Sequence, residues 1–139
     1  MKKENYEKFE KSYKEGIYSP IADNLKENTI FFFYYVGLPC FKIHYTFIDK
    51  IDDDNYLVRK SKSDEVIISK KTYEKFLKKL KKLSKRWKDT CYTNPAMIDG
   101  WHTITYSSDA DVYLNCNNDS PRNYSKLLDL IRKISFGKC

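Results

Sequence analysis

The basic segment from Lys70 to Lys88 constrains the fold of this chain more than any other part of it. Ser69 comes directly before the segment and is predicted to cap a helix, with Ile68 and Tyr73 placed to form a hydrophobic staple. The apolar residues recur every three or four positions, at Tyr73, Phe76, Leu77, Leu80, Leu83 and Trp87. This spacing predicts an amphipathic helix that packs one apolar stripe inward and turns its other face to solvent.

The same segment holds the excess positive charge of the chain. Ten Lys and Arg residues accompany a single acid, Glu74, which leaves the segment with a net charge of +9. The whole chain carries +7, so the other 120 residues carry a net −2. Lys70 and Lys71 lie at the end where the helix dipole disfavours cations, by about 0.3–1 kcal/mol each. The chain is therefore nearly neutral apart from one cationic face, which can attract an anionic partner.

A meander of about four antiparallel strands is predicted before this helix. Residues Ile30–Val36 form a continuous apolar run, typical of a strand buried on both faces. Residues Phe41–Phe47 alternate between apolar and polar, typical of a strand with one face in solvent. An acidic turn is expected at Asp49–Asn55, followed by strands at Tyr56–Arg59 and Val66–Ile68.

The two ends of the chain complete the expected architecture. A first helix is predicted over Lys3–Glu15, and two strands over Trp101–Ser107 and Val112–Cys116. Ser120 and Pro121 are typical of a helix start, which predicts a last helix whose buried stripe begins at Tyr124. The order αββββαββα predicts one α+β domain over residues 1–139. Its core is an antiparallel sheet of about six strands with helices packed against it.

Composition narrows the class of protein. No apolar run approaches the roughly 20 residues that span a bilayer, and the first residues are charged rather than apolar as in a signal peptide. The four cysteines are scattered without a CxxC pair, which favours reduced thiols. We therefore expect a cytoplasmic protein that has no membrane contact.

The lysine face has three interpretations. It can be a solvated helix surface, a grip for nucleic-acid phosphates or a docking surface for an acidic protein. The candidate residues are Lys75, Lys78, Lys79, Lys82 and Lys85. Arg86 is the only arginine there and the aromatic residues occupy the opposite face, so base readout and stacking are not favoured.

The acidic turn is a second candidate surface. Asp52, Asp53 and Asp54 resemble part of a cation loop, but the central glycine and the later glutamate of an EF-hand are missing. A hairpin turn accounts for these residues better. Their carboxylates can also fit the basic cleft of a partner without any metal.

Catalytic and metal chemistry have little support. Cys116 with either His44 or His102 is a conceivable nucleophile pair, but no flanking oxyanion pattern accompanies it. No two Cys or His residues lie close enough together in the sequence to indicate a zinc site. The polar loop around Asn117 is typical of a helix cap, although such a loop can also receive an anion. We expect no enzymatic activity, no metal and no cofactor.

One set of residues, here called the frame, resembles a sequence pattern in a known kind of protein. It comprises Trp87 at the end of a helix, Asp99 and Gly100 leading into the strand at Trp101, and the loop Asn117–Tyr124 that opens the last helix. It covers the C-terminal third and is similar to a frame in small uncharacterised bacterial proteins of the toxin-immunity type. The resemblance implies a protein that binds and neutralises a cognate bacterial toxin.

This chain departs from that kind of protein in charge, because immunity proteins against nucleases are often acidic. The partner would therefore meet either the acidic turn or, if the toxin surface is acidic, the lysine face. The expected function is protein binding by occlusion of the partner's site. The alternative is a nucleic-acid-binding module that uses the Lys70–Lys88 helix.

Overall fold

The computed structural model describes residues 6–7, 10, 26–37, 42–60, 65–85, 87, 90–92, 102–117 and 124–135. Of the first predicted helix, Tyr6, Glu7 and Glu10 are described, and their backbone is helical. The remaining elements are β1 (Thr29–Gly37), β2 (Lys42–Lys50), β3 (Asn55–Lys60), β4 (Glu65–Ser69), α3 (Lys70–Ser84), β5 (Thr90–Tyr92), β6 (His102–Ser107), β7 (Val112–Asn117) and α4 (Tyr124–Ser135).

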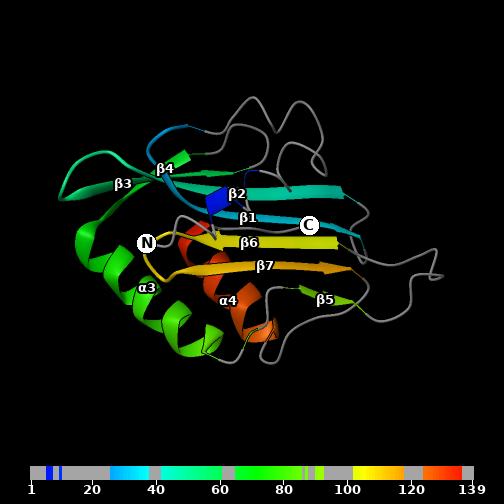
Figure 1. The fold of residues 1–139 in the computed structure, drawn as a ribbon. Helices are drawn as coiled ribbons and strands as arrows, with labels where there is room; N and C mark the ends of the chain where they lie inside the picture. Colours follow the sequence, from blue (N-terminus) through cyan, green and yellow to red (C-terminus); the bar gives the residue numbers. More distant parts are fainter. Residues whose placement is uncertain are drawn as a thin grey trace.

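All the described strands belong to one sheet, in the order β4-β3-β2-β1-β6-β7-β5 (Figure 1). Six of them pair antiparallel with their neighbours, which confirms the predicted α+β class and the predicted sheet. The short strand β5 was not predicted, and it pairs parallel to β7 at one edge. Three residues are too few to establish an alternating pattern, so only the neighbouring strand reveals it.

Strand β1 lies at the centre of the sheet, and residues 31–34 of its apolar run are buried on both faces as predicted. Phe31 and Phe32 point to opposite faces, and both are completely buried. The prediction that one face of β2 is solvated was wrong for its second half. Thr46 and Phe47 are adjacent and are both buried, because β2 lies between β1 and β3 and both sheet faces are covered there.

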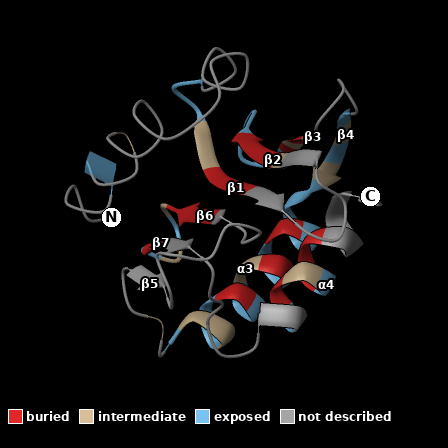
Figure 2. Cartoon of the chain, turned by 90° about the vertical axis from the view of Figure 1, so that its right-hand side faces the viewer, coloured by how far each residue is buried: buried red, intermediate tan, exposed pale blue. Residues whose placement is uncertain are grey.

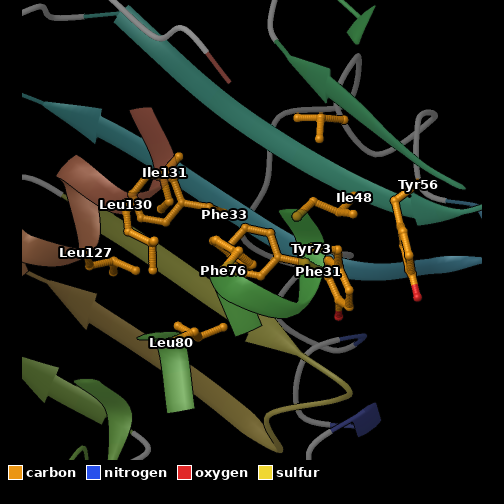
Figure 3. Packing of buried hydrophobic residues seen from close by; sticks show 11 residues of the cluster. Phe31, Phe33, Ile48, Tyr56, Tyr73, Phe76, Leu80, Leu127, Leu130 and Ile131 are labelled. Atoms are coloured by element: carbon orange, nitrogen blue, oxygen red, sulfur yellow. The ribbon is translucent and has the colours of Figure 1, made fainter. Parts of the chain in front are cut away.

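Helices α3 and α4 cover one face of the sheet (Figure 2). Ser69 caps α3 as predicted, because its hydroxyl accepts a hydrogen bond of 3.2 Å from the Thr72 backbone N–H. Phe76 of α3 packs edge-to-face on Phe31 of β1, with ring centroids 5.1 Å apart. The core between the helices and the sheet contains Phe31, Phe33, Ile48, Tyr56, Val58, Tyr73, Phe76, Leu80, Leu127, Leu130 and Ile131 (Figure 3).

The opposite face of the sheet is also buried over its centre. Phe32 and Ile104 lie there with no exposed surface, and Tyr106 is 3% exposed. Tyr6 packs edge-on against Tyr106, with ring centroids 6.3 Å apart, and Tyr106 lies opposite Phe32 on the face away from α3 and α4. Burial raises the pKa of Tyr106 to about 12. The sheet is therefore covered on both faces at its centre.

Candidate charged binding surface

The predicted lysine residues are all exposed, four of them on α3 and Lys85 at its C-cap, with the apolar residues of the helix turned inward. Tyr73, Phe76 and Leu80 are the buried residues of this helix. The exposed residues include each predicted candidate, namely Lys75, Lys78, Lys79, Lys82 and Lys85, together with Lys70, Lys71 and Lys81. The helix therefore presents its cations to solvent because its opposite stripe is held in the core.

Five of these lysines form a line along the exposed side of α3. They follow one another at spacings of four, three, four and three residues, at Lys71, Lys75, Lys78, Lys82 and Lys85. Residues three or four apart are neighbours on a helix surface. With a rise of 1.5 Å per residue, the line extends for about 21 Å. We call these five residues the lysine line.

The charges of the lysine line are not neutralised within the described part of the chain. None of its ammonium groups forms an ion pair with a described carboxylate. Two lysines at this spacing destabilise a helix by about 0.2–0.5 kcal/mol per pair. Repulsion along the line thus opposes the stability of α3, although the helix dipole favours Lys82 in the last turn, and the buried stripe offsets the rest.

The acidic turn between β2 and β3 is ordered by one of its own carboxylates. Asp52 accepts hydrogen bonds from the backbone N–H groups of Asp54, at 2.8 Å, and Asn55, at 2.9 Å, and from the Asn55 side chain. These hydrogen bonds hold the pKa of Asp52 below its ordinary value of 3.8, and the one from the Asp54 backbone N–H contributes most. Asp53 points into solvent and lies 3.6 Å from the Lys50 ammonium. The turn is therefore a rigid hairpin turn, as predicted.

The structure places the two candidate surfaces next to each other. The backbone N–H of Lys70, the first residue of α3, donates a 3.0 Å hydrogen bond to the carbonyl of Asp54. The acidic turn therefore lies at the N-terminal end of α3. Carboxylates near this end are favoured by the helix dipole and partly compensate Lys70 and Lys71. Acidic and basic groups consequently follow one another along one continuous surface.

Asp49 does not belong to the acidic turn, contrary to the prediction. It lies within β2 and is 1% exposed, and its carboxylate receives two hydrogen bonds from Arg59 of β3, at 2.6 and 3.1 Å. The Thr29 hydroxyl donates a third, at 2.7 Å. The Arg59 guanidinium also lies 4.4 Å from the centre of the Phe47 ring. These contacts hold a buried ion pair whose partners come from neighbouring strands, so no local pattern indicates it.

The candidate residues for catalytic or metal chemistry are placed by their backbone only. Within the described part of the chain, no three His, Cys, Asp or Glu residues lie close enough to hold a metal ion. Strand register places Cys116 opposite Thr103, one position from His102, and places His44 opposite Tyr35. The side chains of these three candidates, and the predicted cap at Ser120, lie outside the described residues.

Neither a membrane-spanning helix nor similarity to a known protein indicates a role for this chain. Among the described residues, no helix is both long and apolar enough to span a bilayer. No family model, no curated protein and no solved structure matches this sequence. The charged surface is therefore the feature of this chain that bears on function.

Proposed function

We propose that this chain is a protein-binding module of the immunity type, which docks α3 against an acidic surface of a cognate toxin and occludes its site. The observation that carries the proposal is the exposed, unneutralised lysine line on a helix whose other side is held in the core. A rigid element with many cations steers an acidic partner and aligns it along one direction. Such a module acts in the cytoplasm and performs no reaction of its own.

The acidic turn favours a protein partner over a nucleic acid. A duplex that lay along α3 beyond its first residue would bring its phosphates toward Asp53 and Asp54, which are exposed at that end. A protein can instead place a basic group there and acidic groups along the lysine line. The partner is therefore expected to be acidic over about 21 Å and basic at one end of that patch.

Nucleic-acid binding remains the second candidate, because the lysine line has the spacing and exposure that phosphate contacts need. Such binding depends on counterion release, so its affinity falls steeply with salt. Within the described residues of α3 there is no arginine, and its tyrosine and phenylalanine face the core. Any binding would therefore be independent of base sequence.

Two variants of equal charge test the proposal. Lys78→Glu/Lys82→Glu reverses the middle of the lysine line, whereas Lys26→Glu/Lys126→Glu reverses two exposed lysines elsewhere, and both lower the net charge from +7 to +3. The partner to examine is the product of the adjacent gene, in co-expression growth assays and in titration calorimetry. We expect the first variant to lose protection and at least 100-fold in affinity, while the second changes affinity less than fivefold.

Two results would contradict the immunity proposal. The first is a neighbouring toxin that still kills cells in the presence of the wild-type chain. The second is equal loss of binding in both variants, which would indicate an effect of net charge alone. Titration of a mixed-sequence duplex and a single strand at two salt concentrations decides the nucleic-acid alternative. Binding as strong as that of the protein partner, and weaker at the higher salt concentration, would favour a nucleic acid.

A further inference from the structure

Strand β4 is an edge of the sheet that the described part of the chain leaves open. Its register with β3 runs without a shift from Asn55 opposite Ser69 to Arg59 opposite Glu65. Among the described strands, β4 has no neighbour on its other side. Open edges are common sites of pairing with another chain, and proteins usually protect them.

The register determines which backbone groups face this edge. The Lys70 N–H donates to the Asp54 carbonyl, so these two positions form a hydrogen-bonded pair at the end of the β3–β4 ladder. Hydrogen-bonded and non-hydrogen-bonded pairs alternate along antiparallel strands. Val66 and Ile68 therefore bond to β3, whereas the backbone groups of Glu65, Ile67 and Ser69 point outward. The Ser69 carbonyl accepts the first hydrogen bond of α3. The Ser69 N–H is therefore the only backbone group of this residue that can pair at the open edge.

Strand β4 lacks three devices that commonly protect an edge strand. The strand reads Glu-Val-Ile-Ile-Ser, with no lysine, no proline and no bulge. Ile67 lies at its middle and is 61% exposed, more than the other exposed large apolar side chains of the described residues. An isoleucine in this position favours pairing, since it would gain burial from a facing strand.

We propose that two copies of this chain pair through β4, antiparallel and centred on Ile67. The N–H of Ile67 in each copy then donates to the Ile67 carbonyl of the other, and the Ser69 N–H donates to the Glu65 carbonyl of the other. This match exists because Ile67 is the middle residue of β4 and its backbone groups face outward. The two sheets become one continuous sheet with two-fold symmetry.

Charge also favours a second copy as the partner of this edge. Glu65 is the only charged residue of β4, and in this arrangement it lies beside the Lys70 end of α3 in the other copy. The same contact occurs twice by symmetry. Helix α3 starts beside β4 and runs away from it toward the β7 side of the sheet (Figure 1). In the proposed dimer, most of the two lysine lines therefore diverge.

The contact is short, so the dimer is expected to be weak. One five-residue strand per copy gives an interface at the small end of the range for specific complexes. The lysine line does not take part. The dimer therefore goes beyond the proposed toxin binding, and either proposal can fail alone.

Sedimentation velocity between about 10 µM and 1 mM, a range that brackets a weak interface, tests the dimer. We expect the mean mass to rise above 16.6 kDa toward twice that value. Ile67→Asp and Ile67→Pro are expected to remain monomeric. The proline removes only an outward N–H and leaves the β3 ladder intact. Ile51→Asp is the matched control, because Ile51 is 49% exposed but lies in the β2–β3 turn, and it is expected to dimerise normally.

Hydrogen exchange gives a readout that needs no variant. At high concentration the amides of Ile67 and Ser69 are expected to exchange at least fivefold more slowly than at low concentration, whereas Val66 and Ile68 change little. A wild-type chain that stays monomeric at about 1 mM would overturn the proposal and leave β4 open to a strand of another protein. Association that persists in Ile67→Asp and Ile67→Pro would also overturn it.

Discussion

Tyr73 of α3 donates a 2.6 Å hydrogen bond to the Asp109 carboxylate, which lies in the turn between β6 and β7. Tyr73 is 2% exposed and stacks on Tyr56 of β3, with ring centroids 4.2 Å apart. One side chain thus ties the lysine-bearing helix to two separate parts of the sheet. Burial, followed by the Asp109 contact, raises the pKa of Tyr73.

The Tyr73–Asp109 contact is expected to contribute measurably to stability. Tyr73→Phe should lower the free energy of unfolding by about 1.5–3 kcal/mol, because it removes a hydrogen bond to a charged acceptor. Asp109→Asn retains an uncharged acceptor and should lose about half as much. Urea denaturation at pH 7 measures both. An unchanged midpoint in Tyr73→Phe would show that the contact does not stabilise the fold.

The buried pair of Asp49 and Arg59 is expected to be strongly coupled. Asp49→Leu or Arg59→Met alone should lower the free energy of unfolding by about 3–5 kcal/mol, since each leaves an uncompensated buried charge. The double variant should lose much less than the sum, because two apolar side chains can replace the pair. A double-mutant cycle in urea measures the coupling, and additive losses would contradict it.

Asp52 should contribute to the pH dependence of stability. Its pKa is lowered in the folded state, so its contribution is fully present above the unfolded value of 3.8 and is lost as pH falls through the folded value. Asp52→Asn should therefore reduce the loss of stability between pH 5 and pH 3. Asp53→Asn, one residue away and fully in solvent, is the control. Equal slopes in wild type and Asp52→Asn would contradict this expectation.

Neutralising the middle of the lysine line should stabilise the chain. Lys78→Gln/Lys82→Gln removes like-charge contacts along α3 and should raise the free energy of unfolding by about 0.5–1 kcal/mol at low salt. The gain should shrink at high salt, because salt screens exposed charges. Thermal unfolding at two salt concentrations checks it, with Lys26→Gln/Lys126→Gln as the matched control. A loss of stability would mean that these lysines already have a stabilising role within the fold.

Local periodicity was enough to predict the helix at Lys70 and most strands. The apolar residues of α3 recur with a helical period, and Ser69 precedes them, so its cap and buried stripe were confirmed. Each of these features depends on residues within a few positions of one another. The exposure of the candidate lysines followed from the same pattern, since the side of a helix opposite its buried stripe faces solvent.

The tertiary structure decided everything that depends on which segments become neighbours. Asp49 reads as a turn residue until β3 brings Arg59 beside it, and Thr46 reads as solvated until both sheet faces are covered. Among the described strands, sheet order alone makes β4 an edge, and backbone pairing alone sets the acidic turn against α3. Sequence determined the period and polarity of each element because these are local properties. Burial and pairing were decided by contacts between residues far apart in the chain, which no local pattern reports.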